Sequence, residues 1–364
     1  MNRRRFLASS LTGAAVLPML QACSPRDQSP NDEDVMRDAT DSAVKMLPNR
    51  SDVLRDVVRH ATMAASSHNT QPWTFTLGER AITVLPDLSR RLPIVDPDDH
   101  HLFVSLGCAT ENLVHSALAH GLHADCAVHS DRIDVALEDT AHVRSPLFDA
   151  IPHRQCSRSV YDGQAVSIPE LRLLEAAGRA DGVNVIVLTD KARMETVLEY
   201  VARGNTAQIG DPAFVRELKD WIRFNKADAL RTGDGLFSGS TGSPAIPRWL
   251  GRLLLGALLT PKSENDKGAR QLRSSAGVAI FVSDESRPSD WIQVGRCYER
   301  FALQATSLGI RSAFLNQPVE VVALRSQFAA WLSIGERRPD LVVRFGRGPE
   351  MPRSRRRPVE QVLI

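Results

Sequence analysis

The chain has 364 residues, of which 43% are hydrophobic and 24% are charged. This length suits about two domains, and the composition is that of a globular protein. A formal net charge of only +2 gives no support for nucleic-acid binding. Clusters of positive charge occur at 3–5 and 353–357. The five cysteines show neither C-x-x-C spacing nor Cys/His spacing for a metal, and their odd number leaves at least one unpaired.

The first 23 residues have the pattern of an export signal. Arg3-Arg4-Arg5-Phe6-Leu7 resembles a twin-arginine motif, and the apolar run that continues to Leu20 is too short for a dependable membrane span. Leu20-Gln21-Ala22-Cys23 resembles a lipoprotein box; the alternatives are simple cleavage or a retained amphipathic helix. We expect an exported protein, periplasmic or anchored to the membrane through Cys23. Residues 24–47 are rich in Ser, Pro, Asp, Asn and Gln, which predicts a disordered linker.

The first half of the folded body, 48–146, alternates helical and extended patterns. Apolar spacing and alternation predict elements at 52–63 (helix, capped by Asn49 or Ser51), 73–77 and 81–85 (hairpin), 102–122 (helix), 126–128 and 133–137 (strands). Within it, His100-His101 has no partner spacing for a metal. Because adjacent residues of a regular element point apart, we expect no metal site there.

The polar stretch 64–75, AASSHNTQPWTF, joins the first helix to the hairpin. It brings hydroxyls and amides next to free backbone N–H groups at a helix end: Ser66, Ser67, Asn69 and Gln71. Such groups suit a flat polar ligand, although an ordinary helix–loop–strand corner is the alternative. The sequence pattern S-S-x-x-N-x-Q-P-W-x-F resembles the flavin-contacting segment of the FMN-dependent nitroreductase superfamily. It is most similar to the Acg-like branch, in which two nitroreductase-like halves are fused; Ala65 replaces the usual Pro.

Two arginines follow the join to the second half, 147–364. Arg154 and Arg158 stand four residues apart, as in a phosphate-binding fork, although two surface arginines are the alternative. The segment resembles the opening R-R-S-x-R-x-F of nitroreductases, which holds the FMN phosphate and ribityl chain. Arg154 and Arg158 match its outer arginines. Cys156 replaces the usual Ser, and Tyr161 replaces Phe with one extra residue before it.

The remaining patterns predict helices at 168–177, 191–203, from 211 and at 289–308, and strands at 183–188, 277–283 and 341–345. Arg300 and Glu299 of the long helix are expected in solvent. The Gly-rich and then apolar region 230–267 is either a lid over the flavin, as in Acg-like chains, or a surface excursion with one buried helix.

Two further segments complete the expected site. Asn316 and Gln317 match the position where the family presents backbone N–H groups to flavin N5 and O4; a turn that caps the next helix is compatible with this. The basic run 353–357 resembles the family segment that adds positive charge at the phosphate, and Arg355 and Arg356 are predicted to point inward.

We expect an α+β fold: two nitroreductase-like halves, each a mixed sheet flanked by helices, form an internal pseudo-dimer. The second half lacks a copy of the 64–75 motif, so one composite FMN site is expected. The resemblance implies an oxidoreductase that reduces a quinone, nitroaromatic or similar acceptor, with no catalytic side chain because the flavin carries the chemistry. An exported protein would not meet NAD(P)H, which favours a quinol or protein donor. The alternatives are an FMN-sequestering protein with little turnover and a flavin-free lipoprotein module.

Overall fold

The computed structural model describes residues 49–364, except the side chains of 257 and 258. The predicted signal 1–23 and the predicted linker 24–47 lie outside the described residues. The described residues, 49–364, belong to one compact unit, Asp41–Ile364. In the part of the chain that the structure describes, no helix combines the length and the apolar character needed to span a membrane.

The first half is built on a four-stranded antiparallel sheet with the strand order β1-β2-β4-β3. Asn49 caps the first helix by accepting a hydrogen bond from the Asp52 N–H, as its position in the sequence predicts. The elements of this half are α2 (Arg50–Ala61), η1 (Ser67–Asn69), β1 (Trp73–Leu77), β2 (Ala81–Pro86), η2 (Leu88–Arg90), α3 (His100–Ala119), β3 (Leu122–Val128), β4 (Ile133–Asp139), α4 (Pro146–Ala150) and η3 (Ile151–His153).

The second half is built on another four-stranded antiparallel sheet, in the order β5-β8-β10-β9. Its elements are α5 (Ile168–Ala177), β5 (Val183–Leu188), α6 (Lys191–Gly210), α7 (Pro212–Trp221), β6 (Ile222–Arg223), α8 (Lys226–Thr232), β7 (Leu236–Phe237), η4 (Ser238–Thr241), α9 (Arg248–Leu258), α10 (Pro261–Arg273), β8 (Gly277–Ser283), α11 (Pro288–Ser307), β9 (Arg311–Phe314), α12 (Gln317–Glu320), α13 (Val322–Leu332), β10 (Arg338–Gly346) and η5 (Val359–Gln361).

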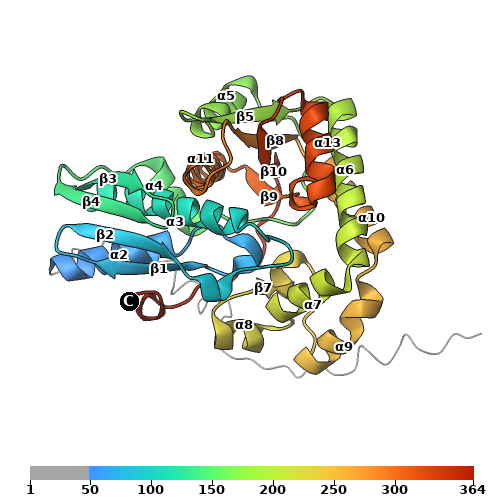
Figure 1. The fold of residues 1–364 in the computed structure, drawn as a ribbon, viewed down its shortest axis with the longest axis horizontal. Helices are drawn as coiled ribbons and strands as arrows, with labels where there is room; N and C mark the ends of the chain where they lie inside the picture. Colours follow the sequence, from blue (N-terminus) through green and yellow to red (C-terminus); the bar gives the residue numbers. More distant parts are fainter. Residues whose placement is uncertain (1–48) are drawn as a thin grey trace, which may run out of the picture. The chain divides into compact units, whose positions relative to one another are not determined.

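The two sheets have the same topology. If β5, β8, β9 and β10 are matched in chain order to β1, β2, β3 and β4, the two strand orders become identical. In each half a 20-residue helix, α3 or α11, connects the second strand to the third. The first and second strands are joined by a short turn in the first half, whereas α6 to α10 stand between them in the second half (Figure 1).

The helices α3 and α11 pack against each other, and a matched pair of glycines permits their close approach. A Cβ atom on Gly107 would lie 1.9 Å from the Ile292 carbonyl oxygen, and one on Gly295 would lie 1.9 Å from the Val104 carbonyl oxygen. Each glycine is the eighth residue of its helix. This reciprocal contact is what a two-fold axis between equivalent helices produces. The predicted α+β fold of two halves in an internal pseudo-dimer is confirmed.

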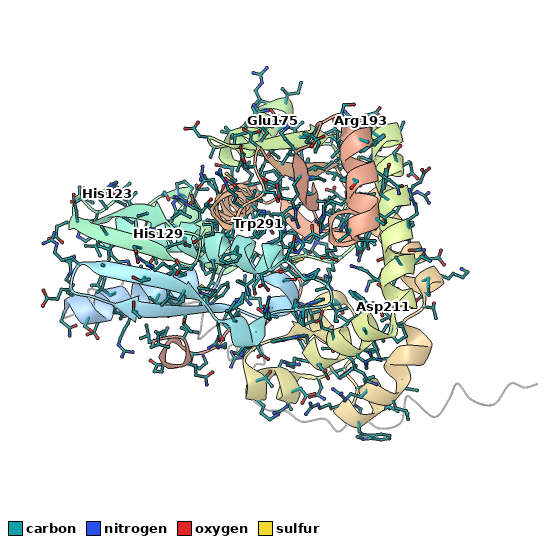
Figure 2. All side chains as sticks on the ribbon, viewed as in Figure 1. His123, His129, Glu175, Arg193, Asp211 and Trp291 are labelled. Carbon is teal, nitrogen blue, oxygen red and sulfur yellow. The ribbon has the colours of Figure 1, made fainter. Side chains whose placement is uncertain are left out.

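One apolar core joins the two halves, because side chains from both sheets and from α3 and α11 belong to the same buried cluster. Trp291 of α11 lies in the interior, whereas His123 of β3 and Asp211 before α7 point outward (Figure 2). The C-terminal tail returns to the first half, where the Phe75 N–H donates to the Val362 carbonyl at 2.7 Å.

Several elements were not predicted, among them α4, α8, α10 and β9. The region 230–267 is largely helical, and its apolar helix α9 exposes Trp249 and Leu253 rather than burying them. The expectation of one buried helix there is therefore wrong. Apolar residues in α9 are frequent enough to suggest burial, but sequence does not show that α9 contacts its neighbours on only one side.

Candidate functional site

The polar loop between α2 and β1 has an unusual backbone. His68, Asn69 and Gln71 all have positive φ values, of 49°, 53° and 53°. Left-handed non-glycine residues each cost about 1–3 kcal/mol and persist only where the surroundings hold them. Three within four residues indicate a loop whose shape is fixed by the rest of the molecule.

The amides of Asn69 and Gln71 supply much of that fixation. Asn69 Nδ2 donates to the carbonyls of Gly235 and Arg355, both at 3.0 Å. Gln71 Nε2 donates to the Gly233 carbonyl at 2.9 Å. These predicted binding residues therefore tie the loop to the segment after α8 and to the C-terminal tail, so three distant parts of the sequence meet here.

The two predicted serines behave differently from the amides. Ser66 Oγ accepts a hydrogen bond from the Gln71 N–H at 3.1 Å, which closes the loop on itself. The half-buried Ser67 hydroxyl makes no hydrogen bond within the described residues, so of the four predicted binding residues of the loop Ser67 is the one with a free polar side chain.

A buried ion pair stands at the start of the loop. Arg154 Nε lies 2.8 Å from Glu299 Oε1, and both side chains are almost fully enclosed. Arg154 also donates to the Met63 carbonyl at 2.8 Å, and the second Glu299 oxygen accepts from the Ala65 N–H at 3.3 Å. Burial opposes the charge on Arg154, but Glu299 holds the pKa of the guanidinium above its ordinary value.

A second arginine gives this centre a net positive charge. Arg356 donates to the carbonyls of Met63 and Ala64 at 3.2 and 3.1 Å. Burial and the charge of Arg154 lower the pKa of Arg356 to about 9. Two guanidiniums and one carboxylate leave an excess positive charge, which an anionic group would balance.

One sequence expectation needs correction at this centre. Glu299 is fully buried, not in solvent. It lies on the buried stripe of α11 with Gly295, Tyr298 and Ala302, a helical spacing that was visible in the sequence. The phosphate fork of Arg154 and Arg158 stays a prediction: Arg154 pairs with Glu299, and Arg158 lies outside that pair.

Arg158 belongs to another part of the site. Its charge, added to burial, lowers the pKa of His68 to about 4. It also acts on Glu320, whose pKa is nevertheless raised by burial. Among the described residues the Arg158 guanidinium forms no hydrogen bond or ion pair, whereas its carbonyl accepts from Gln271.

Cys156, between these arginines, is half-buried and is positioned by a backbone bridge to the edge strand β9. It pairs with Ser312, and the next residue, Ser157, donates its N–H to the Ser312 carbonyl at 2.9 Å. The bridge fixes the course of the 154–158 segment.

The C-terminal basic run turns two arginines inward. One is Arg356, as predicted. The other is Arg357, whose N–H donates to Gln71 Oε1 at 2.8 Å and whose Nη1 donates to the Gln71 carbonyl at 3.0 Å. Arg355 contributes its carbonyl to Asn69. Sequence could not choose among these arginines, because their orientation depends on the loop that they contact.

Asn316 and Gln317 follow β9 and form the start of α12. Asn316 Oδ1 accepts from the Val342 N–H at 3.0 Å, and its Nδ2 faces His101 Nε2 at 3.3 Å. Gln317 Oε1 is buried and has no hydrogen-bond partner among the described residues. His68 Nδ1 has the same property. Two buried polar atoms that lack protein partners are consistent with a ligand edge that supplies them.

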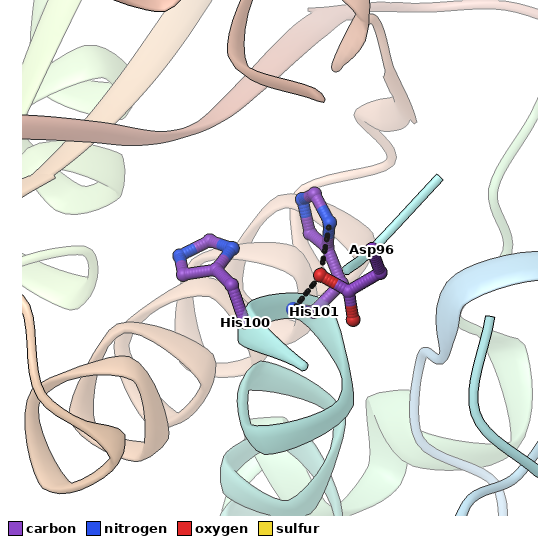
Figure 3. Close-up of side chains that lie close together, drawn as sticks. All are labelled: Asp96, His100 and His101. Carbon is purple, nitrogen blue, oxygen red and sulfur yellow. Dashed lines mark hydrogen bonds and ion pairs between the residues drawn. The ribbon is translucent and has the colours of Figure 1, made fainter. Parts of the chain in front are cut away.

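His101 connects Asn316 to a carboxylate that the sequence analysis did not single out. Its Nδ1 lies 3.5 Å from Asp96 Oδ1, and Asp96 also accepts from the N–H groups of His101 and Leu102, both at 3.0 Å (Figure 3). The adjacent His100 bonds to buried Asp340 at 2.9 Å. The two imidazole centroids are only 4.7 Å apart, so the expectation that adjacent histidines point apart is wrong. At a helix start the two rings lean to the same side.

The hydrogen-bond directions define the protonation of His101. Because Asn316 Oδ1 accepts from the main chain, Nδ2 is the group that faces His101, and it can donate only to an unprotonated Nε2. The proton then sits on Nδ1, toward Asp96. Burial alone would lower the pKa of His101, but Asp96 holds that pKa above its ordinary value. Protonation of Nε2 would therefore break the contact with Asn316.

The segment after α8 is clamped to the polar loop by an ion-pair network. Asp234 pairs with Arg90 and with Arg223, the latter at 2.6 Å, and Arg90 also donates to the Thr70 carbonyl. The Trp221 ring lies 5.4 Å from the Arg90 guanidinium and 5.7 Å from that of Arg223. The segment between β5 and β8, which we call the insertion, is therefore attached to the site through charged and aromatic contacts.

Comparison with known proteins agrees with the motif resemblance. No protein-family model matches the sequence. A Mycobacterium tuberculosis protein is 25% identical over 331 residues, which cover 86% of this chain and 91% of its own. The protein called acg from the same organism is 24% identical over 331 residues, which cover 86% of this chain and 96% of its own. Both are provisionally named as NAD(P)H nitroreductases. The chain is thus similar to these two proteins over most of its length.

Solved nitroreductase structures match part of the chain. One is a nitroreductase with bound FMN from Bacteroides fragilis, with 14% identity and a TM-score of 0.36, covering 59% of this chain and 94% of that chain. Another is an FMN-dependent nitroreductase from Mycobacterium smegmatis in complex with NADPH, with 16% identity and a TM-score of 0.37, covering 57% of this chain and 94% of that chain.

Proposed function

We propose that the protein is an FMN-dependent oxidoreductase of the nitroreductase type, which reduces a small acceptor such as a quinone or a nitroaromatic compound. The observation that carries the proposal is the meeting of three motif segments at one site: the strained 66–72 loop, the cationic centre of Arg154 and Arg356, and the Asn316–Gln317 turn. The relatives named as NAD(P)H nitroreductases support it.

The residues present fit a phosphorylated flavin. The excess positive charge beside Glu299 suits a phosphate, and the unpartnered His68 Nδ1 and Gln317 Oε1 suit the polar edge of a flat ring. When bound, the flavin supplies the electron-transfer chemistry. The chain would hold the phosphate with Arg356 and Arg154 and another polar edge of the flavin with Arg158, whose charge acts on His68. The fixed loop and the Asn316 turn would orient the ring and exclude water.

The first test is the absorption spectrum of the folded protein, followed by FMN titration of an Arg158→Ala variant. Among the described residues no group pairs with the Arg158 guanidinium, so Arg158→Ala tests FMN binding without leaving a buried protein group unpaired. We expect FMN affinity to fall roughly tenfold, with Arg172→Ala, an exposed residue of α5, as the control. Absence of flavin binding by the parent protein would refute the proposal.

The electron donor is a separate question. The names of the relatives favour NAD(P)H, whereas a twin-arginine export signal would keep the protein away from that pool and favour a quinol or a protein donor. Anaerobic mixing with NADPH and with a soluble quinol analogue distinguishes them. Rapid bleaching of the flavin absorbance by NADPH alone would exclude the need for a quinol.

We also propose export by the twin-arginine route, with a lipid on Cys23. Replacing Arg3 and Arg4 together by Lys should leave the protein in the cytoplasm. Metabolic labelling with a radioactive fatty acid should be lost in Cys23→Ser. A secreted, unlabelled parent protein would contradict the anchor but not the export.

Sequestration of FMN is the second candidate function, and one observation favours it: the insertion is attached to the binding loop by the amides of Asn69 and Gln71 and by Asp234, which pairs with Arg90. Such attachment would hinder acceptors. Flavin reduced with dithionite on the protein should then be re-oxidised by quinones or nitroarenes no faster than in buffer. Faster re-oxidation by either acceptor would favour the enzyme.

A further inference from the structure

The helix α9 has a one-sided surface that the proposed function leaves unexplained. Trp249 and Leu253 are each 70% exposed and, being four residues apart, lie on one face. Leu254 extends this apolar surface. The chain has five tryptophans, and Trp249 is the one that is exposed.

The opposite side of α9 is fixed to the protein. Gly251 is buried so closely against the Phe224 ring that a Cβ atom would lie 2.2 Å from it. Leu250 is half-buried, and Arg252 pairs with Asp220 of α7 at 3.1 Å. A helix that is held along one side and apolar along the other presents its outer face in a constant orientation.

The composition of α9 points to the chemistry of its partner. It contains Arg248 and Arg252 and no acidic residue. Within the described residues, the exposed Arg248 guanidinium forms no ion pair or hydrogen bond. Exposed Trp and Leu flanked by Arg are typical of helices that lie in the plane of a bilayer surface, where the cations meet lipid phosphates. With 11 residues, α9 is too short to span the bilayer.

A second copy of the chain fits this face less well. A two-fold contact through α9 would bring the arginines of both copies together, with no acidic residue on either helix to balance them. A membrane, in contrast, accords with the lipoprotein-like Cys23. The 25 residues from Ser24 to Pro48 span about 80 Å when extended, which is enough for an anchored chain to bring the folded body back onto the bilayer.

We propose that the outer face of α9, formed by Trp249, Leu253 and Leu254, is a docking surface for a phospholipid bilayer. It would hold the segment that contacts the polar loop against the membrane. The inference uses the lipid-anchor prediction as support, but it does not depend on flavin binding.

The experiment uses the full chain with Cys23→Ser, so that no lipid anchor contributes. Vesicles of phosphatidylethanolamine and phosphatidylglycerol are pelleted with the parent protein and with Trp249→Ser/Leu253→Ser. The matched control is Ile168→Ser/Val322→Ser, whose residues are 66% and 61% exposed on α5 and α13. We expect the α9 variant to need roughly tenfold more lipid for half-maximal binding, and the control to match the parent.

Tryptophan fluorescence gives a second readout. The emission of the parent minus that of Trp249→Phe should shift to shorter wavelength when vesicles are added. Equal pelleting of the parent and the α9 variant, or a difference spectrum unchanged by vesicles, would overturn the proposal. A dimer in vesicle-free solution that is lost in Trp249→Ser/Leu253→Ser would also overturn it, in favour of contact between copies. Circular dichroism verifies that every variant is folded.

Discussion

The buried pair between Arg154 and Glu299 offers the sharpest test of how the site is held together. In Glu299→Gln the amide keeps an oxygen for the Ala65 N–H, but Arg154 and Arg356 lose their shared carboxylate. At 2.8 Å, Coulomb's law with an effective dielectric constant of about 20 gives an attraction of about 6 kcal/mol. Part of this is offset by desolvation of the charges, and breaking such a pair usually costs about 3–5 kcal/mol.

Urea unfolding of the flavin-free protein, followed by circular dichroism, measures this cost. We expect Glu299→Gln to lower the free energy of unfolding by about 3 kcal/mol, because it leaves buried positive charge uncompensated. The double variant with Arg154→Met should lose less than the sum of the two single variants, with a coupling of about 1–3 kcal/mol. The control is Glu195→Gln, which breaks a pair with Arg273 whose side chains are 46% and 61% exposed, and which should change stability by less than about 1 kcal/mol.

The same series reports on the ligand. If Glu299→Gln folds, it should bind FMN more tightly, since the phosphate would then replace the missing negative charge. A destabilisation below about 1 kcal/mol together with strictly additive variants would show that Arg154 does not depend on Glu299. Arg154 would then be free to act as the phosphate fork that the motif suggested.

Three other predictions concern the frame around the site. Gly107→Ala should lower the stability by about 3 kcal/mol or prevent folding, because the added methyl meets the α11 backbone, whereas Gly256→Ala, with open space around it, should be neutral or stabilising in thermal unfolding. Burial lowers the pKa of His60 to about 4, so between pH 6.5 and 4 the unfolded chain binds a proton at this residue and the folded chain does not. The free energy of unfolding should therefore fall as the pH drops from about 6.5 toward 4, by up to ~1.4 kcal/mol per pH unit, and His60→Gln should flatten that slope. Asp234→Asn should speed limited proteolysis within 226–258 about tenfold, whereas Asp266→Asn, which breaks an exposed pair with Lys262 inside α10, should leave the rate unchanged.

Most elements of both sheets could be read from the sequence because each carries a local signal. The helix α5 begins at Ser167, which forms a capping box with Glu170, and Pro169 follows at the first turn. The strand β8 is an uninterrupted apolar run that is buried along its whole length. In contrast, β9 is short, and its pairing with β10 is a long-range contact that no local pattern encodes.

The site was predictable only as far as its motifs extend. The motif singles out Asn69 and Gln71, but their partners are the carbonyls of Gly233, Gly235 and Arg355, and backbone carbonyls are the same at every residue and give no sequence signal. Asp96 was overlooked because it lies in a loop rich in Asp, and only the fold shows that it is the one that meets the start of α3.

The pseudo-symmetry explains why a duplicated frame supports one composite site. The stretch between α2 and β1 is the polar loop, whereas the equivalent stretch between α5 and β5 is a short turn at 178–182 that leaves no room for a second loop. A short turn joins β1 to β2, whereas the insertion stands at the equivalent place between β5 and β8. Gly233, Asp234 and Gly235 of the insertion contact the polar loop or its neighbour Arg90, and this is the only polar loop of its type among the described residues. The first half thus carries the polar loop, and the second half carries the segment that contacts it. Restoring symmetry by deleting 222–258 should therefore disturb the loop geometry of the first half, because Gln71 would lose the Gly233 carbonyl and Asn69 would keep only the Arg355 carbonyl.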